Sequence, residues 1–289
     1  MACRKSHEET DFIVKDLPIN QGGIGRHKCP SCAYEKGLAN GKNHNENFDI
    51  SSFISNLPES QKGLRRHRDP FEAYELGYFH GQIEASKHLS ISDKKGISFT
   101  MRNFGLSMIA KGLLVALKKD DLPYIHAMGI INITNGFEIL IKAKIVEEHP
   151  LLIFDKITKN EKETEQELEF NYLLENGRTI EYSKLPYQLW ATTNYKINNK
   201  ELYKEVGFLR NQIIHFHIPI KVSLIDKILK YVFDIIEPCI NDWWDRTVFK
   251  YVKVFDRNSY EKLFKEIERL NISSNYKYDK KSGYKLKND

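Results

Sequence analysis

Residues 23–41, GIGRHKCPSCAYEKGLANG, recur 40 positions later as residues 63–81, GLRRHRDPFEAYELGYFHG. At this constant offset, identical residues occupy Gly23/Gly63, Arg26/Arg66, His27/His67, Pro30/Pro70, Ala33/Ala73, Tyr34/Tyr74, Glu35/Glu75, Gly37/Gly77 and Gly41/Gly81. Upstream, Leu-Pro at 17–18 and 57–58 and Gln at 21 and 61 extend the match. Unrelated stretches of this length would share only about one or two identities, so the pattern indicates an internal duplication.

Each copy predicts a loop followed by a helix. Pro30 and Pro70 stand where the first turn of a helix tolerates proline. Glycines four residues apart then share one helix face, at 37 and 41 and again at 77 and 81. Since each costs about 1 kcal/mol of helix propensity, close packing of another backbone is the expected reason for them. We therefore expect a pseudo-symmetric pair of repeats, over roughly residues 10–92, in an N-terminal module of residues 1–95.

A C-x-x-C pair, Cys29 and Cys32, occurs in the first copy, whereas the second copy has acidic residues at both positions. A closed structural zinc site needs four Cys or His ligands, and the sequence contains no second C-x-x-C. If the repeats pair about a pseudo-twofold axis, His27 and His67 are the best completing ligands. A structural zinc site of these four residues is one interpretation. Two free buried thiols or a redox-active pair are the others.

Composition and charge are those of a soluble globular protein. The 289 residues are 41% hydrophobic and 29% charged, and no apolar run approaches the ~20 residues of a membrane-spanning helix. The basic N-terminal residues precede no apolar segment of a signal peptide, so we expect a cytoplasmic protein without a membrane partner. A net charge of +5 and a pI near 8.8 permit a polyanionic partner without requiring one.

Beyond a polar linker that ends at Gly96, apolar residues recur at helical spacing. They predict an all-α, up-and-down helical bundle over residues 96–272, with helices near 99–119, 122–148, 199–216, 223–236, 239–255 and 260–270. A charged stretch near Thr158–Glu169 is expected to be a surface loop or a disordered insertion. The lysine-rich residues 273–289 are expected to form a flexible basic tail, either simply solvated or contacting phosphates as an arm.

The segment GFLRNQIIHFHIP, residues 207–219, carries the candidate chemistry. Asn211 and His215 are four residues apart and share a helix face, and the long side chain of Arg210 can reach the same space. A guanidinium can bind a phosphate bidentately, and an imidazole can take or give a proton near neutral pH. RNA brings its own nucleophile, the 2′-hydroxyl, so a phosphodiester could be cleaved without a metal. A surface Arg and a helix-capping His are the alternative interpretation.

Arg210-Asn211-x-x-x-His215 resembles the Arg-polar-x-x-x-His signature of the HEPN superfamily. The segment NGFEILIKAKIVEEHP, residues 135–150, is similar to the second long helix of that superfamily, and the order of helices over residues 97–256 agrees. The resemblance implies a homodimer whose two motif helices face one composite cleft. It also implies metal-independent endoribonuclease activity leaving a 2′,3′-cyclic phosphate and a 5′-hydroxyl, with Arg210, Asn211 and His215 catalytic. Such domains commonly act as toxins or abortive-infection effectors in anti-phage defence, cleaving tRNA or other RNA.

Three further residues are candidates for the cleft. Glu138 and Lys142, four apart, would line it, or else form an ordinary surface ion pair. His217 would be a second imidazole, or else a capping residue beside Pro219. Relatives silenced by a nucleotidyltransferase antitoxin carry His-x-Tyr; here the segment reads His-Phe-His, which puts that mode of silencing in doubt.

Two rival functions stay open from the sequence. One is a non-catalytic HEPN adaptor that binds nucleotides or RNA as a dimer. The other, a zinc-dependent DNA-binding regulator, is weaker because no helix-turn-helix or finger spacing is present. The duplicated module resembles no family, and its basic segments at residues 26–28 and 65–68 would either contact nucleic-acid backbone or be solvated loops. Sensing, substrate recruitment or control of the ribonuclease, including by a regulatory partner, is its expected role.

Overall fold

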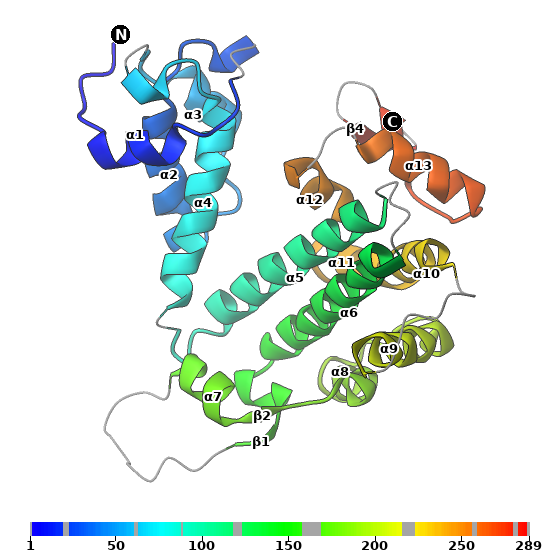
Figure 1. Ribbon diagram of the computed structural model, residues 1–289. Helices are drawn as coiled ribbons and strands as arrows, with labels where there is room; N and C mark the ends of the chain where they lie inside the picture. The colour runs from blue at the N-terminus through cyan, green and yellow to red at the C-terminus, as the bar shows by residue number, and fades with distance from the viewer. Residues whose placement is uncertain are drawn as a thin grey trace. The chain divides into compact units, whose positions relative to one another are not determined.

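The computed structural model describes residues 2–19, 23–60, 63–87, 89–117, 123–157, 169–215, 223–255, 259–279 and 283–287. Its contacts divide the chain into two compact units. One comprises Met1–Gly96 with Gln166–Asn171, and the other Ile97–Glu165 with Tyr172–Asp289. The fold is predominantly helical, as the sequence predicts, with small two-stranded sheets (Figure 1).

The first unit is built from two copies of one helical arrangement. Its elements are α1 (Glu8–Val14), η1 (Gly23–Gly25), α2 (Pro30–Lys42), α3 (Ile50–Ser55), η2 (Gly63–Arg65) and α4 (Pro70–Ser86). The duplication extends further upstream than the sequence identities do, since Val14 in α1 and Ile54 in α3 are 40 residues apart and both fully buried. Each repeat is therefore a short helix, a loop with a 3₁₀ turn, and a long helix.

Helices α2 and α4 pack backbone to backbone through their glycines. A Cβ added to Gly37 would lie 2.1 Å from the carbonyl oxygen of Tyr74, and one added to Gly77 would lie 2.1 Å from that of Tyr34. Gly41 and Gly81 make the same kind of contact one turn later. The contacts are reciprocal at the 40-residue offset. Moving one turn along α2, from Gly37 to Gly41, also moves the contact one turn forward along α4, from Tyr74 to Tyr78. The two helices are thus parallel, and their N-termini lie at the same end.

The loop before each long helix forms hydrogen bonds with the other repeat. The Cys29 amide donates to the carbonyl of Pro58 at 2.9 Å, and the equivalent Asp69 amide donates to that of Pro18 at 3.1 Å. Side chains repeat the exchange: Lys28 donates to the Leu57 carbonyl at 3.0 Å, and Arg68 donates to the Leu17 carbonyl at 2.6 Å. Each repeat supplies backbone acceptors for the other, so we expect that neither repeat folds alone.

The second unit is a helical assembly centred on α6, residues Pro123–Val146 (Figure 1). Its further elements are α5 (Lys94–Ala116), α6 (Pro123–Val146), η3 (Pro150–Ile153), α7 (Phe170–Asn176), η4 (Tyr182–Lys184), α8 (Leu185–Thr193), α9 (Lys200–His215), α10 (Leu224–Tyr231), the π-helical turn η5 (Val232–Ile236), α11 (Glu237–Trp244), α12 (Val248–Phe255) and α13 (Ser259–Arg269). Helices α5 and α6 run antiparallel and meet at glycines, with a Cβ on Gly105 reaching within 2.8 Å of the Gly136 carbonyl. Helices α8, α9 and α10 pack on α6.

Two sequence-based expectations need correction. The helix expected over 239–255 is two helices, because Asp245 takes a left-handed conformation (φ 51°) that ends α11. The tail expected to be flexible contains an antiparallel hairpin of β3 (Tyr276–Asp279) and β4 (Gly283–Leu286). Its Tyr276 ring lies 5.2 Å from that of Phe249, and this aromatic contact anchors the hairpin. A second pair, β1 (Phe154–Lys156) and β2 (Arg178–Thr179), was not predicted.

The loop predicted near Thr158–Glu169 falls, apart from Glu169, outside the described residues; Glu169 forms an isolated bridge with Ser90. None of the described helices combines the length and apolar character needed to span a membrane.

Candidate functional site

Helix α9 places the Arg-Asn motif beside a cluster of tyrosines. Its buried side includes Tyr203, Val206, Gly207 and Leu209. At Gly207 the helix comes so close to Tyr182 that an added Cβ would lie 2.5 Å from the ring. The glycine therefore lets α9 approach η4 and brings Arg210 toward α6.

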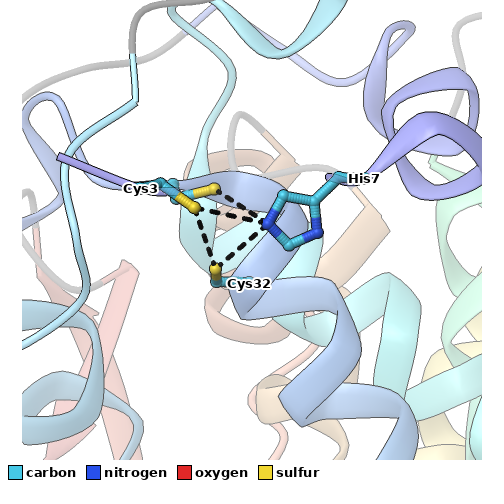
Figure 2. Close-up of side chains that lie close together, drawn as sticks. Cys3, His7 and Cys32 are labelled. Atoms are coloured by element: carbon cyan, nitrogen blue, oxygen red, sulfur yellow. Dashed lines mark hydrogen bonds between the residues drawn. The ribbon is translucent and has the colours of Figure 1, made fainter. Parts of the chain in front are cut away.

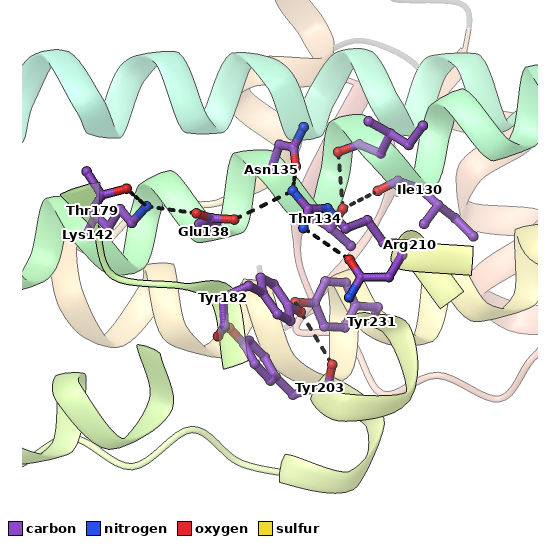
Figure 3. A network of polar contacts seen from close by, with 12 residues as sticks. Ile130, Thr134, Asn135, Glu138, Lys142, Thr179, Tyr182, Tyr203, Arg210 and Tyr231 are labelled. Carbon is purple, nitrogen blue, oxygen red and sulfur yellow. Dashed lines mark hydrogen bonds and ion pairs between the residues drawn. The ribbon is translucent and has the colours of Figure 1, made fainter. Parts of the chain in front are cut away.

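Arg210 is held by two residues of α6 (Figure 3). Its Nη2 donates to Asn135 Oδ1 at 3.0 Å and lies 3.9 Å from Glu138 Oε2, while Nη1 donates to Asn211 Oδ1 at 3.3 Å. Among the described residues, its Nε is buried and has no hydrogen-bond partner. The contacts of Nη1 and Nη2 hold the guanidinium in position.

The Glu138–Lys142 pair is not an ordinary surface ion pair. Lys142 Nζ donates to Glu138 Oε1 at 2.7 Å and to Thr179 Oγ1 at 3.1 Å, and the two charged side chains are only 9% and 19% exposed. Glu138 thus lies between two cations, Lys142 and Arg210. The three charges sum to one positive charge, which favours an anionic ligand over a cationic one.

A pocket of about 920 Å³ opens over this network. Arg210, Asn211 and Glu138 line it, together with Tyr182 and Tyr203, whose rings stack at 4.3 Å. Burial raises the pKa of Tyr182 and Tyr203, so both phenols stay neutral and act as hydrogen-bonding groups. The Tyr203 hydroxyl donates to the Tyr182 carbonyl at 2.8 Å, which fixes the wall of the pocket.

The rim of the pocket combines aromatic and basic side chains. Tyr187 and Trp190 line it, are 68% and 41% exposed, and meet edge to face at 5.7 Å. Lys200 and Lys204 lie on the same lining. Exposed aromatic rings beside lysines are the combination that binds bases and phosphates of single-stranded nucleic acids.

The predicted histidines are placed differently from Arg210 and Asn211. His215 is the last residue of α9, is exposed, and does not line the pocket. It lies one helical turn beyond Asn211. His217 falls outside the described residues.

A second candidate site lies in the first unit, where Cys3, His7, Cys29 and Cys32 converge. Figure 2 shows Cys3, His7 and Cys32 pointing toward one another. Their ligand atoms all lie within 4.8 Å of one another, with His7 Nε2 at 3.4, 3.9 and 3.3 Å from the sulfurs of Cys3, Cys29 and Cys32. The Sγ atoms of Cys3 and Cys32 are 3.6 Å apart, far longer than the sulfur–sulfur bond of a disulfide. A tetrahedron with metal–sulfur bonds of ~2.3 Å has edges of roughly 3.8 Å, so these residues could hold a metal ion.

The surroundings of the cluster suit metal binding. The other nitrogen of His7, Nδ1, is 2.6 Å from Glu35 Oε1, the carboxylate contact that commonly orients a metal-binding imidazole. Hydrogen bonding to Cys32 lowers the pKa of Cys29 to about 5, and the same contact raises the pKa of Cys32. Arg65 Nη1 also donates to Cys29 Sγ at 3.8 Å. These contacts favour a thiolate at Cys29.

The predicted ligand set was half wrong. Cys29 and Cys32 belong to the cluster, but His27 and His67 do not. Both histidines sit in left-handed turns (φ 63° and 61°) before their helices, and each accepts from the preceding arginine. The ligands that complete the cluster, Cys3 and His7, come from the N-terminal segment. Their Cys-x-x-x-His spacing was the available signal in the sequence.

Comparisons with protein-family models, with curated proteins and with solved structures returned no match.

Proposed function

We propose that the chain is a HEPN-type, metal-independent endoribonuclease with Arg210, Asn211 and His215 as its catalytic residues. The observation that carries the proposal is Arg210, which lines the pocket and is held by Asn135 and Glu138 in a network with one net positive charge. A fixed guanidinium stabilises charge that develops on phosphate oxygens without reorganising during the reaction.

In the proposed reaction the 2′-hydroxyl attacks the adjacent phosphorus as the bond from phosphorus to the 5′-oxygen breaks. The products are a 2′,3′-cyclic phosphate and a 5′-hydroxyl, and no water or metal is consumed. Arg210 binds the phosphate, and Asn211 helps to position it. His215 takes the proton of the 2′-hydroxyl or returns one to the leaving oxygen.

The pocket rim supports single-stranded RNA, such as a tRNA loop, as the substrate. Tyr187 and Trp190 offer ring faces for unstacked bases, and Lys200 and Lys204 offer phosphate contacts. In a cell, such activity fits a toxin or abortive-infection effector in the cytoplasm that is held inactive by a regulatory partner until triggered.

The position of His215 supports a homodimer. Because His215 lies outside the pocket, a second α9 facing the first is needed to close a composite site around the RNA. Helix α9 exposes Phe208 and Ile214 (66% and 45%), apolar side chains that a second copy would cover.

The test is the chemistry of RNA ends after induced expression. The wild type is expected to generate 2′,3′-cyclic phosphate and 5′-hydroxyl ends. Arg210→Ala and His215→Ala are each expected to lower cleavage at least 100-fold, since each removes a group acting in the transition state. Arg269→Ala, in an exposed arginine on α13, is the matched control and should cleave normally. Equal RNA integrity with all four proteins would exclude catalysis by this motif.

The alternative is a non-catalytic HEPN adaptor that binds RNA or nucleotides. The engagement of Arg210 by Glu138 specifically favours it, because a catalytic arginine must share its donors between this carboxylate and the phosphate. It predicts RNA binding that weakens in Arg210→Ala, with no cyclic-phosphate ends from any variant.

For the first unit, we propose that the metal of the Cys3–His7–Cys29–Cys32 cluster is zinc in a structural role. Four protein ligands leave no open position for a substrate, and Cys₃His is an ordinary structural zinc set. Purified protein should contain one zinc per chain. Cys32→Ser and His7→Ala should lower that content, and His27→Ala should not. Full zinc retention in His7→Ala would remove His7 from the ligand set.

A further inference from the structure

The same basic turn is built twice in the first unit, at residues 23–28 and 63–68, here called the twin turns. Each begins with a glycine at positive φ (Gly23 60°, Gly63 55°) and includes a histidine in the left-handed region. In each, an arginine Nε donates to that histidine, from Arg26 at 3.3 Å and from Arg66 at 3.1 Å. The repeats therefore share a side-chain arrangement as well as a backbone path.

The helix pair places both turns at one end of the unit. Because α2 and α4 are parallel and related by reciprocal glycine contacts, the turns that precede them are neighbours about a pseudo-twofold axis. The exchanged hydrogen bonds of Cys29 with Pro58 and of Asp69 with Pro18 fix each turn to the other repeat. The spacing between Arg26 and Arg66 is thus set by the fold.

Packing accounts for most of what the repeats share, but not for these arginines. The shared glycines, tyrosines and alanines of α2 and α4, and the prolines that begin these helices, lie in the helix contact or the core. Lys28 and Arg68 anchor backbone carbonyls of the other repeat. Arg26 and Arg66, in contrast, are exposed in both copies. A side chain retained twice on the surface calls for a ligand outside the fold.

Charge indicates what that ligand is. The twin turns contain five Arg or Lys residues, two His and no Asp or Glu in their twelve residues. Arg65 is buried and paired with Asp11 at 3.4 Å, so the outward charge comes mainly from Arg26 and Arg66. Beside them, Ile24 and Leu64 are exposed at matching positions. Cationic tips with a small apolar contact suit a phosphate–sugar backbone.

We propose that the twin turns bind the backbone of a nucleic-acid duplex, with Arg26 and Arg66 each contacting a phosphate on a different strand. The strands of a duplex are themselves related by local twofold axes, so a twofold pair of arginines matches them. Backbone contacts of this kind position a protein without reading sequence. The binding is separate from the proposed cleavage, because no residue of the α9 pocket takes part.

The experiment measures affinity of the full chain for a 20-base-pair DNA duplex as a function of salt. DNA has no 2′-hydroxyl and survives an active ribonuclease, so failure of this proposal and of the nuclease proposal are distinguishable. A 2′-O-methylated RNA duplex and the single strands of both probes form the other arms. Lys42→Ala/Lys87→Ala is the matched control. It removes two exposed lysines at the C-terminal ends of α2 and α4, whereas the twin turns precede the N-terminal ends.

Arg26→Ala/Arg66→Ala is expected to weaken duplex binding at least 10-fold and to reduce the slope of log K against log salt by about 2, one unit for each lost phosphate contact. Each single variant should reduce the slope by about 1, half of the change in the double variant. Arg26→Lys/Arg66→Lys should keep the slope of the wild type. The proposal would be overturned if the control variant Lys42→Ala/Lys87→Ala lost as much duplex affinity as Arg26→Ala/Arg66→Ala. Equal, arginine-dependent binding of the single strands would also overturn it, as would a double variant that binds like the wild type while retaining its circular dichroism spectrum. Whichever duplex binds more tightly identifies DNA or RNA as the source.

Discussion

Substituting alanine for Gly77 sets two effects of opposite sign against each other. In an exposed helix position alanine is about 1 kcal/mol better than glycine. In this structure the new Cβ would lie 2.1 Å from the Tyr34 carbonyl oxygen and 3.0 Å from the Leu38 nitrogen, both backbone atoms. Since a comfortable contact between carbon and oxygen is about 3.3 Å or more, α2 and α4 must separate by roughly 1 Å.

That separation would cost more than the gain in helix propensity. Overpacking by one methyl typically costs about 1–3 kcal/mol, and here no flexible side chain can yield. Two interhelical hydrogen bonds also depend on the spacing: Asn40 donates to the Tyr74 hydroxyl at 2.7 Å, and Tyr34 pairs with His80 at 2.7 Å. Each is worth about 1 kcal/mol. We expect Gly77→Ala to destabilise the first unit by about 2–4 kcal/mol.

Hydrogen exchange read by mass spectrometry on peptides from α2 and α4 measures the effect locally. The tryptophans Trp190, Trp243 and Trp244 all belong to the second unit, so the urea midpoint of tryptophan fluorescence should stay unchanged. Ala39→Gly on the exposed side of α2 is the matched control and should cost only about 1 kcal/mol. Unchanged or increased protection of α2 and α4 in Gly77→Ala would refute the close helix contact.

Three further outcomes follow from the structure. Gly207→Ala should push Tyr182 from the pocket wall and cost about 1–3 kcal/mol, seen as a lower Trp fluorescence midpoint. Burial raises the pKa of Glu237 from 4.5 to about 7. Between these pH values the folded protein keeps a proton that the unfolded chain has lost, so the free energy of unfolding should decrease as the pH rises. Glu237→Gln should flatten this decline in urea titrations at several pH values. Asp69 accepts from the Phe71 amide at 2.8 Å as the N-cap of α4, so Asp69→Ala should cost the first unit about 1 kcal/mol in hydrogen exchange.

Many helices of the chain were predictable, because their signals are local, but α7 and α8 were not predicted. Apolar periodicity gave α5, α6 and α9 to within a few residues, and the 40-residue identity offset gave the paired repeats. The glycine spacing in α2 and α4 also gave the close contact, although not its parallel direction. The break between α11 and α12 was missed because it depends on one left-handed residue, Asp245, in an otherwise helical pattern.

Site residues were predictable only where they share a helix. Arg210 and Asn211 were found from the motif, whereas Asn135, 75 residues away, became a partner only through the packing of α9 on α6. The Tyr182–Tyr203 stack likewise joins segments whose pairing no local pattern encodes. For the Cys3–His7–Cys29–Cys32 cluster, the C-x-x-C pair was recognisable in the sequence. Repeat symmetry pointed to His27 and His67 as the other ligands, but the N-terminal segment that supplies Cys3 and His7 breaks that symmetry.

Two differences between the repeats lie at or beside the Cys3–His7–Cys29–Cys32 cluster. Cys29 corresponds to Asp69, which caps its own helix, and Gly25 corresponds to Arg65, which reaches Cys29 and Asp11. If zinc is the ion, as proposed, three thiolates and a neutral histidine would give the site one net negative charge, which the adjacent Arg65 would offset. The second repeat thus supplies a counter-charge for the site of the first instead of a site of its own. On this view the glycine contacts that set the pseudo-twofold axis had to stay equal in both copies, while the residues at the helix starts were free to take complementary roles.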